Sequence, residues 1–478
     1  MTDPDAVVVG AGPNGLAAAI TLAREGWSVH VVEAAEQVGG GSRTAELTLP
    51  GFRHDVCSAV HAMAYLSPFI RSAGLESLGV RWVEPSAPLA HSFANRPAVV
   101  VERDISATAA GLGADAHRYA SILGGVVHAR EAFADTVLGP LLRIPRHPLF
   151  MAGFGRYALL PASILSRLFS TTAARAVVGG TAAHAIAPLS QPLTGAAALM
   201  MLGTAHGGGW PLARGGSQAV VDALAERLVG LGGTIECGRE VRRIADLPRA
   251  RAHLFDVSPR QLARICAPEL PARYLRALRR FRAGPGVFKL DYALSAPIPW
   301  RDPRCLGAAT VHVGDRFEDV AASEAAVAAG RVPERPFLIV VQPSLFDRSR
   351  APAGRHTAWV YCHVPAGSDL DMTERIERRL EEHAPGFRDA VLARHALNAT
   401  DLERYDPNYE GGDIAGGRNS VMQIVFRPAV RLSPYTTPNP RIFLCSASTP
   451  PGGGVHGMCG YHAARAVLRR HHGVRALR

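Results

Sequence analysis

The chain has 478 residues, of which 47% are hydrophobic, and it carries a formal net charge of +11. This length permits two or three domains with a sizeable core. The positive charge is almost entirely arginine, because Lys289 is the one lysine, and the arginines are scattered instead of clustered. Since no zinc-finger, helix-turn-helix or RNA-binding signature accompanies them, the sequence argues against nucleic acid as a partner.

The N-terminal segment VVVGAGPNGLAAA predicts a βαβ unit that binds a dinucleotide. Its hydrophobic pattern indicates a buried strand over 6–9, a helix over about 16–25 and a second strand over 28–32. The glycines between the first strand and the helix permit a tight turn, the approach of a pyrophosphate and close helix packing. Free N–H groups at the helix start favour the anion. The predicted binding residues in this turn are Gly10, Gly12, Pro13, Asn14 and Gly15.

Glu33 ends the second strand, where a carboxylate accepts hydrogen bonds from the hydroxyl pair of a ribose. A carboxylate at this position disfavours a 2′-phosphate, so we expect no NADP-type ligand here. A second glycine cluster follows in EQVGGGSRTAEL. It suits close approach of another part of an extended cofactor, although a flexible turn closed by a surface arginine is the alternative. The predicted binding residues here are Gly40, Gly41, Ser42 and Arg43.

The centre of the chain contains one further cofactor segment between two long inserts, 75–205 and 285–420. The first insert is helical in character and includes a basic, apolar stretch over 136–170. The segment WPLARGGSQAVVDALAERLVGLGGTIECGREVRRI then predicts a helix over 217–230 and paired strands over 234–244. The second insert has apolar runs that predict strands of a sheet lying over the cofactor: 287–294, 336–346 and 357–364.

The C-terminal segment repeats the order of strand, glycine loop and helix. RIFLC predicts a short strand over 441–445, the loop over 449–457 is rich in proline and glycine, and a helix is expected over 458–470. Backbone N–H groups at such a loop and helix start can point at a ligand.

Together these motifs resemble the FAD-dependent phytoene desaturase, carotenoid isomerase and amine oxidase superfamily. Within it, PNYEGGDIAGG over 407–417 and CSASTPPGGGVHGMCG over 445–460 resemble the NAD(P)/FAD-dependent oxidoreductase branch that includes the pyridine nucleotide-disulphide oxidoreductase domain-containing protein 2 type. The resemblance covers both ends of the chain and the segment near residue 210. It implies FAD as the cofactor, and it is unspecific about the substrate.

The resemblance also implies an architecture and further contacts. It implies an α/β fold with a discontinuous Rossmann-type FAD-binding domain over 1–75, 205–285 and 420–478, and an inserted α+β substrate domain over 76–204 and 286–419. It places the backbone of Val241 beside the adenine. Near the flavin ring it places Gly453, Gly454, Val455 and His456.

The candidate catalytic residues are His456, His54 and Asp55. Histidine can carry a proton near neutral pH. His456 lies in the loop assigned to the flavin, but a histidine in such a turn is often only a spacer. His54 and Asp55 follow the second glycine cluster, where a structural salt link is an equal alternative. No metal-ligand spacing is present.

The function expected is desaturation of a hydrophobic, polyprenoid or lipid-like small molecule by hydride transfer to FAD. A redox-neutral isomerase or saturase, an amine oxidase and a flavin-binding scaffold with little turnover are the alternatives. The few aromatic residues, 6% of the chain, give no sign of the aromatic cage of an amine oxidase. No second GxGxxG domain for NAD(P)H is present, so oxygen, a quinone or a redox protein remains open as the electron acceptor.

The cellular location expected is cytoplasmic. The seven cysteines are widely spaced and include no CxxC, which favours reduced thiols, and the N-terminus MTDPD lacks the features of a signal peptide. The stretch 136–170 leaves open a peripheral contact with a membrane or a tunnel wall for an apolar substrate, but an ordinary amphipathic helix pair explains its pattern as well.

Overall fold

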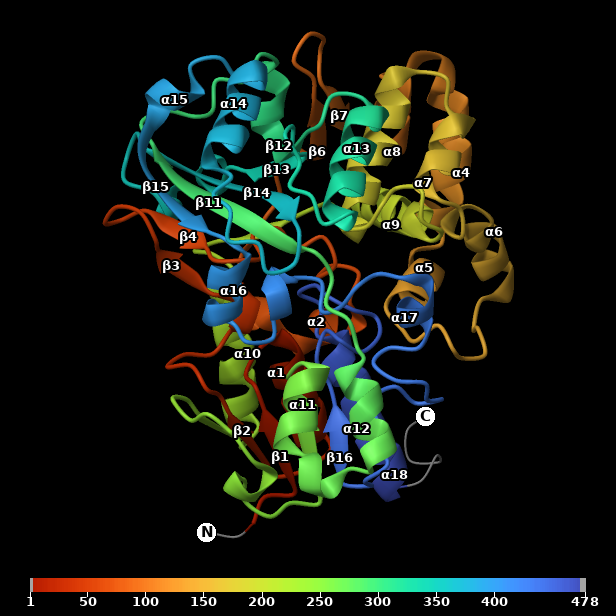
Figure 1. Ribbon diagram of the computed structural model, residues 1–478, viewed down its shortest axis with the longest axis vertical. Helices are drawn as coiled ribbons and strands as arrows, with labels where there is room; N and C mark the ends of the chain where they lie inside the picture. The colour runs from red at the N-terminus through yellow and green to blue at the C-terminus, as the bar shows by residue number, and fades with distance from the viewer. Residues whose placement is uncertain (1–2, 473–478) are drawn as a thin grey trace.

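The computed structural model describes residues 3–472, and two sheets organise them (Figure 1). The lower sheet in that view is parallel, with strand order β16-β10-β1-β2-β9. Its central strands are short apolar runs buried on both faces, as parallel sheets require. The strands are β1 (Ala6–Val9), β2 (Val29–Val32), β9 (Thr234–Glu236), β10 (Ala252–Phe255) and β16 (Ile442–Leu444).

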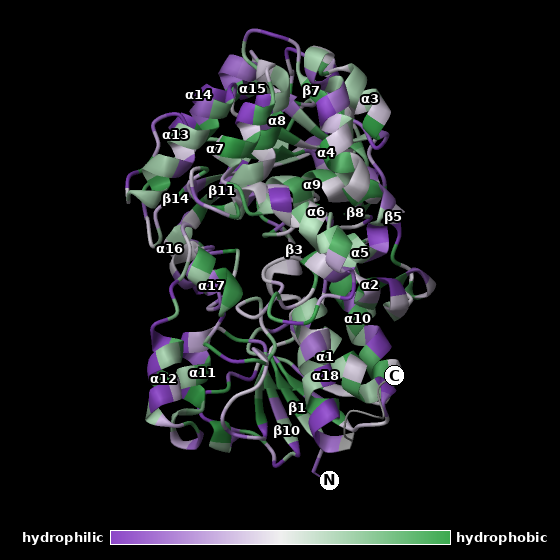
Figure 2. Cartoon of the chain, turned by 90° about the vertical axis from the view of Figure 1, so that its right-hand side faces the viewer, coloured by the Kyte–Doolittle hydropathy of each residue, from purple (hydrophilic) through white to green (hydrophobic). Residues whose placement is uncertain are grey.

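Helices cover both faces of this parallel sheet (Figure 2). One face packs against α1 (Pro13–Arg24), α10 (Gln218–Gly230) and α18 (Met458–His472), and the other against α11 (Pro259–Ile265) and α12 (Ala272–Arg279). The first and last helices meet closely, since a Cβ built on Gly460 would lie 1.8 Å from the carbonyl oxygen of Asn14. This contact fixes the C-terminal loop beside the N-terminal glycine turn.

The second sheet has seven strands in the order β15-β11-β14-β13-β12-β6-β7. Its neighbours are antiparallel except for β12 and β6, which run parallel. The strands are β6 (Ala87–Ser92), β7 (Val99–Val101), β11 (Gly286–Leu294), β12 (Ala308–Val313), β13 (Leu338–Val341), β14 (His356–Val364) and β15 (Val391–Leu397).

The two faces of the seven-stranded sheet pack against different helices. One face shares a core with α4 (Ala116–His128), α8 (Thr172–Ala182) and α9 (Thr194–Gly207). The other face packs against α14 (Thr373–His383) and α15 (Phe387–Ala390).

Shorter elements complete the two lobes and their edges. Two small antiparallel pairs are β3 (Thr44–Glu46) with β4 (Arg53–Asp55) and β5 (Trp82–Val83) with β8 (Leu212–Ala213). The remaining helices are α2 (Pro68–Ala73), α3 (Ile105–Ala110), α5 (Arg130–Val137), α6 (Pro148–Ala158), α7 (Ala162–Leu165), α13 (Phe317–Ala328), α16 (Ala399–Tyr405) and α17 (Val421–Val425).

The predicted fold class is confirmed: the parallel sheet is Rossmann-like, with helices on both faces. All its strands lie within 1–75, 205–285 and 420–478, and the strands of the second sheet lie within 76–204 and 286–419. The first insert is not purely helical, because β6 and β7 join the edge of the second sheet.

The paired strands predicted over 234–244 are wrong. Only β9 forms, and it pairs in parallel with β2. Gly238 then adopts φ +74°, and the N–H of Arg239 donates to the carbonyl oxygen of Glu33 at 2.9 Å. The chain therefore turns away from the sheet after β9, and it re-enters the sheet only at β10.

In the part of the chain that the structure describes, no single helix has the length and apolar composition to cross a membrane. Two helical segments, Pro148–Ala158 and Ala162–Leu168, together have that length and composition, but they are bent by 86° where they meet.

Candidate functional site

A cavity of about 1680 Å³ lies between the two sheets. Its floor is formed by residues at the carboxyl ends of β1, β2, β10 and β16, and its roof includes residues of β12, β13 and β14. Doubly wound folds bind ligands at the carboxyl ends of their parallel strands. The volume exceeds the roughly 300–1,000 Å³ that is usual for one small-molecule site, so the cavity has room for a dinucleotide and a second molecule.

The N-terminal glycine turn forms one end of this cavity. Gly10 has φ +101°, a conformation that side chains other than glycine rarely adopt. A Cβ on Gly15 would lie 2.0 Å from the carbonyl oxygen of Gly10, so only glycine lets α1 begin this close to β1. Gly10, Gly12, Pro13 and Asn14 line the cavity, whereas Gly15 supports them from behind. The turn has the shape expected for an approaching pyrophosphate.

Glu33 stands at the end of β2 and also lines the cavity. Its Oε2 accepts a hydrogen bond from the N–H of Ala11 at 2.7 Å, and its Oε1 accepts one from the N–H of Ala35 at 2.9 Å. Arg43 Nη2 lies 3.5 Å from the same Oε1. These contacts fix the carboxylate, and each oxygen retains a lone pair that a ribose hydroxyl can use.

Three polar side-chain atoms beside the turn test whether a dinucleotide fits. Asn14 Oδ1, Ser42 Oγ and Arg43 Nε are buried without a hydrogen-bond partner, and all three residues line the cavity. An unpaired buried polar group costs about 1–3 kcal/mol, so such atoms mark places where a ligand group pairs with the protein. Gly40 and Gly41 line the cavity next to them. The residues therefore fit a bound dinucleotide.

Two acids that the sequence analysis did not select line this end of the cavity: Asp256, which is buried, and Asp406, which is partly buried. Asp256 follows β10, and its Oδ2 accepts the N–H of Gly15 at 2.7 Å. Burial raises the pKa of Asp256 to about 8, with smaller contributions from Asp406 and Glu33. Burial likewise raises the pKa of Asp406. A strand that ends in an acid, as in AHLFD, is the signal that could have identified Asp256.

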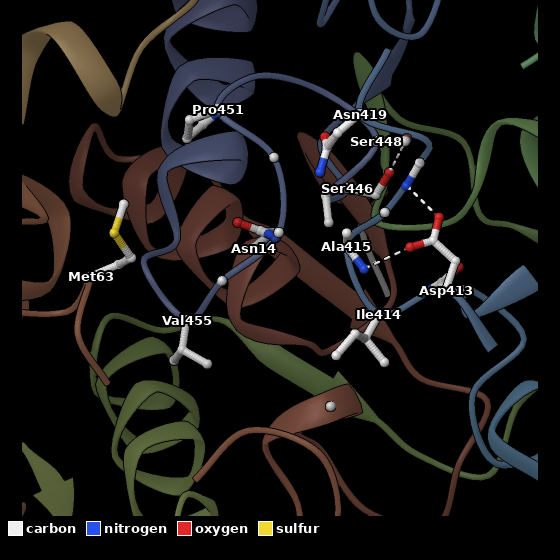
Figure 3. A pocket seen from close by; sticks show the side chains of 18 of the residues that line it. Asn14, Met63, Asp413, Ile414, Ala415, Asn419, Ser446, Ser448, Pro451 and Val455 are labelled. Carbon is white, nitrogen blue, oxygen red and sulfur yellow. Dashed lines mark hydrogen bonds between the residues drawn. The ribbon is translucent and has the colours of Figure 1, made fainter. Parts of the chain in front are cut away.

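The C-terminal loop forms the part of the wall beside the glycine turn (Figure 3). Gly453, Gly454 and Val455 line the cavity, and a Cβ on Gly453 would lie 3.0 Å from the carbonyl oxygen of Ala415. The loop that contains Ala415 is held by Asp413, which accepts N–H groups from Ala415 at 2.8 Å, Gly417 at 2.7 Å and Gly284 at 2.6 Å. Asp413 therefore has a positioning role.

Val241 lies in the segment after β9 and lines the cavity beside Glu240. Its side chain is buried against the face of the parallel sheet that α11 and α12 cover. The cavity-lining position permits the predicted contact with an adenine, which stays a prediction.

His456 lies next to the cavity-lining loop, outside the lining itself. Its Nδ1 accepts the N–H of Met458 at 3.0 Å, and its Nε2 lies 3.2 Å from the carbonyl oxygen of Gly452. Both ring nitrogens therefore hold the turn into α18. Burial lowers the pKa of His456 to about 4. This geometry supports a structural role and gives no support to proton transfer from a substrate.

His54 and Asp55 lie on β4, away from the cavity lining. His54 Nε2 lies 2.8 Å from Thr48 Oγ1, and burial lowers the pKa of His54 to about 3. Asp55 forms a buried ion pair with Arg350 at 2.7 Å and accepts the N–H of Ser217 at 2.8 Å. The structure therefore supports the structural alternative for His54 and Asp55. Asp55 links the domain of the parallel sheet to Arg350 in the second insert.

Several aromatic side chains line the cavity although the aromatic content of the chain is low. Trp359 and Tyr361 pack edge to face at 4.9 Å in the roof of the cavity. Tyr405 lies under Arg43 at 5.3 Å, and its hydroxyl donates to the carbonyl oxygen of Gly40 at 3.0 Å. The chain has few aromatic residues, but folding brings several of them to one place. The aromatic side chains that line the cavity include Phe154, Trp210, Phe281, Trp359, Tyr361, Tyr405 and Tyr409.

Comparisons with known proteins agree with this geometry. Residues 8–70 match the family model of an NAD(P)-binding Rossmann-like domain. The chain is 26% identical to pyridine nucleotide-disulfide oxidoreductase domain-containing protein 2 of Rattus norvegicus, over 97% of this chain and 93% of that protein. It is 28% identical to phytoene dehydrogenase of Streptomyces griseus, over 81% of this chain and 77% of that protein.

The chain therefore has homologues among these oxidoreductases. Its fold is also that of putrescine oxidase, whose wild-type structure bound to putrescine superimposes with a TM-score of 0.61 at 18% identity and covers 98% of this chain and 99% of that chain. An oxidoreductase from Methanosarcina mazei gives a TM-score of 0.62 at 16% identity, over 97% of this chain and 99% of that chain. These matches confirm the fold and agree with the predicted relationship, which implies FAD as the cofactor class.

Proposed function

We propose that this protein is an FAD-dependent oxidoreductase that desaturates a hydrophobic, polyprenoid or lipid-like substrate. The observation that carries the proposal is one cavity that extends from the glycine turn to the roof formed by the seven-stranded sheet. FAD bound in it would supply the acceptor for a hydride from a C–H bond. Binding, orientation, exclusion of water and proton removal fall to residues of the chain.

The dinucleotide end would hold the cofactor through charge and backbone donors. Glu33 would accept ribose hydroxyls, while the N–H groups at the start of α1 would face the pyrophosphate. Arg43 would neutralise part of the phosphate charge with its unpaired Nε. The loop around Gly453 would lie against the ring system, as the resemblance implies.

The rest of the cavity has the character of a chamber for an apolar molecule. Its lining away from the glycine turn is dominated by aliphatic, thioether and aromatic groups, which exclude water and bind by burial of apolar surface. These residues include Met63, Phe154, Ile186, Met200, Ile339 and Val341. A long hydrocarbon is the substrate class that such a lining favours.

Amine oxidation is the second candidate, because the fold is shared with putrescine oxidase and aromatic side chains line the cavity. An amine cation in a buried site needs a carboxylate partner. Asp413 does not provide one, because both of its oxygens accept backbone N–H groups. The other acids in the described lining are Glu33, Glu240, Asp256, Asp406 and Glu410, and they belong to the dinucleotide end or its rim. This distribution favours an uncharged substrate.

The same cavity would also serve a redox-neutral isomerase, a saturase or a scaffold with little turnover. Identification of the product distinguishes these alternatives from desaturation. The electron acceptor, whether oxygen, a quinone or a redox protein, is equally a matter for experiment. We also propose a cytoplasmic location, which is in keeping with seven cysteines that are all free thiols in the structure.

The mouth of the cavity supports the proposal of a peripheral contact with a membrane. Met151 of α6 and Ile424 of α17 line the cavity. Close to them in sequence, Ile144 is 93% exposed, Leu149 is 88% exposed and Leu432 is 93% exposed. Exposed apolar side chains beside an entrance, with arginines such as Arg146 among them, fit docking on an anionic lipid surface from which an apolar substrate would enter.

Product analysis tests the proposed reaction. The purified, flavin-loaded protein is incubated with a saturated polyprenoid, with a conjugated polyene and with a diamine, and the products are identified by mass. Loss of two hydrogens from a polyprenoid or polyene supports desaturation. An aldehyde from the diamine would instead establish amine oxidation, and a product of unchanged mass with shifted double bonds would establish isomerisation.

A further inference from the structure

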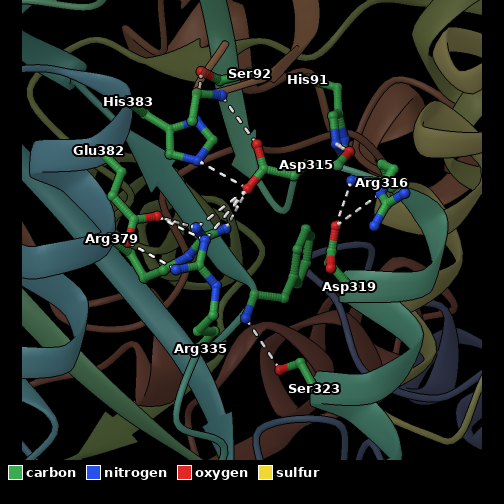
Figure 4. Close-up of polar contacts among 12 residues, drawn as sticks. His91, Ser92, Asp315, Arg316, Asp319, Ser323, Arg335, Arg379, Glu382 and His383 are labelled. Atoms are coloured by element: carbon green, nitrogen blue, oxygen red, sulfur yellow. Dashed lines mark hydrogen bonds and ion pairs between the residues drawn. The ribbon is translucent and has the colours of Figure 1, made fainter.

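A row of three histidines, of which His312 and His91 are buried and His184 is partly buried, connects the cavity to the edge of the seven-stranded sheet. His184 lines the cavity, and its Nε2 lies 2.9 Å from Nε2 of His312 on β12. His312 stands directly opposite His91 on the neighbouring strand β6. His91 Nε2 in turn lies 2.9 Å from the carbonyl oxygen of Asp315 (Figure 4). Sheet register therefore places the second and third histidines side by side, and a turn after α8 brings the first to them.

The partners of these rings allow a set of protonation states in which His184 has a free lone pair. A carbonyl oxygen only accepts, so His91 Nε2 donates and His91 Nδ1 holds a lone pair. The Nδ1 atoms of His91 and His312 both face Gly180, where a Cβ would lie 2.9 Å and 2.5 Å from them, and neither has another hydrogen-bond partner. With the proton of His312 on Nδ1, its Nε2 accepts from Nε2–H of His184. Nδ1 of His184 then carries a lone pair that a molecule in the cavity can use, because His184 lines the cavity.

The turn that carries His184 is held in a fixed and strained conformation. It ends at Ile186, which also lines the cavity and adopts φ +47° without being glycine. Asn419 Nδ2 donates to the carbonyl oxygen of Ala185 at 2.9 Å, and the ring of Trp210 meets His184 edge to face at 6.1 Å. Strained backbone that the surroundings hold in place is concentrated at functional sites.

We propose that His184 is the base that takes the substrate proton in the oxidation, and that His312 receives the proton that His184 releases from its other nitrogen. This inference rests on the proposed function. One C–H bond of the substrate breaks and its electron pair leaves as a hydride, which reduces the oxidised flavin. The neighbouring C–H bond also breaks, its electron pair becomes the new C=C bond, and its proton moves to Nδ1 of His184. The proton on Nε2 of His184 then passes to Nε2 of His312.

A weak base is sufficient for this step. Burial lowers the pKa of His184 to about 3, so its ring is neutral near pH 7 and its lone pair is free. Loss of a hydride leaves positive charge on a substrate carbon, and this charge makes the C–H bonds of the neighbouring carbon strongly acidic. A neutral imidazole is therefore basic enough to remove the proton. His312 is likewise neutral near pH 7, because burial lowers its pKa well below the usual value, and the contact between the two Nε2 atoms is the path along which the proton passes.

Other titratable groups surround the row, and burial lowers the pKa of His91 at its far end to about 4. On the side of β14, His363 Nδ1 lies 2.8 Å from the carboxylate of Glu324, whose negative charge offsets a positive charge on the His363 ring. Beyond His91, Asp315 forms an ion pair with Arg379 at 3.2 Å, and its Oδ2 lies 3.6 Å from Nε2 of His383 (Figure 4). The carboxylate of Asp315 is 18% exposed, so the row ends near solvent.

Chemical modification tests the accessibility of His184 without measuring activity. The flavin-loaded protein is treated with diethyl pyrocarbonate, and modified histidines are mapped by peptide mass. We expect His184 to react, a bound polyene to protect it, and His312 to remain unmodified. Exposed His117 is the reactive control. An unreactive His184 beside a reactive His117, or no protection by a polyene that binds, would overturn the assignment.

Variants test the chemical role. With a polyene that bleaches the wild-type flavin anaerobically, His184→Gln should bleach about 100-fold more slowly, as for removal of a general base, with unchanged flavin content and substrate affinity. Added imidazole should restore part of the rate of His184→Ala. His312→Asn, a positioning change, should slow bleaching less and alter its pH profile.

His253→Gln is the matched control, because His253 is a buried histidine outside the cavity lining whose Nε2 lies 3.0 Å from the carbonyl oxygen of Pro248. Equal bleaching rates for His184→Gln and His253→Gln would overturn the assignment of His184 and leave the proposed function intact. If no polyene or lipid bleaches the wild type, the proposed function fails first, and the base assignment fails with it.

Discussion

Replacement of Asp256 by asparagine should change how stability depends on pH. Burial raises the pKa of Asp256 to about 8 from 3.8. Between these values the folded protein holds a proton that the unfolded chain has released. The free energy of unfolding of the wild type therefore falls as pH rises through this window, and the loss is complete above about pH 8.

The slope follows from the shift. One proton contributes about 1.4 kcal/mol per pH unit, so between pH 5 and 7 this carboxyl lowers the free energy of unfolding by about 2 to 3 kcal/mol. Asp256→Asn keeps the shape and can still accept the N–H of Gly15, but it has no proton to lose. We expect the thermal midpoint of the variant, relative to wild type, to rise by a few degrees from pH 5 to pH 7.

The assay is a set of thermal scans at pH 5, 6, 7 and 8 on flavin-free wild type and variant. Asp369→Asn, a change at an exposed side chain, is the control for removal of one negative charge. If the difference between Asp256→Asn and wild type is the same at every pH, or equals that of Asp369→Asn, then Asp256 does not hold a proton in the folded state and the reasoning is refuted.

Three further predictions test other parts of the site. Gly15→Ala would place a Cβ 2.0 Å from the carbonyl oxygen of Gly10, so flavin absorbance per protein should fall severalfold, whereas Gly153→Ala, with no neighbour within 4 Å, should retain it. Leu149→Glu should reduce flotation with anionic vesicles while flavin content stays unchanged, and equal flotation would contradict docking through α6. His456→Gln should lower thermal stability but leave anaerobic bleaching within about threefold, a range well below the loss expected for a proton-transferring group.

The parts of the fold that the sequence predicted are those specified by local pattern. Hydrophobic periods and turn residues allow one interpretation for the strand over 6–9, for the helix that follows it and for the C-terminal strand over 441–445. The glycines at 10 and 15 are similarly specific, because a close backbone approach requires each of them, and at Gly12 a Cβ would lie 3.1 Å from Oδ2 of Asp256.

The parts that the sequence did not predict depend on distant partners. β6 and β7 join a sheet whose other strands come more than 180 residues later, so no local pattern assigns them to it. His184 and His312 are 128 residues apart and meet only through sheet register and the turn after α8. His456 attracted a catalytic interpretation because of its motif, whereas its hydrogen bonds to Gly452 and Met458 became visible only in the folded loop.

The most direct test of the central claim combines a visible absorption spectrum with anaerobic reduction. The purified protein should show the absorption of bound flavin, the released cofactor should have the mass of FAD, and the absorption should bleach when a polyprenoid or polyene is added without oxygen. A protein that binds no FAD after reconstitution, or whose bound FAD bleaches with a diamine and with no hydrophobic substrate, would contradict the account.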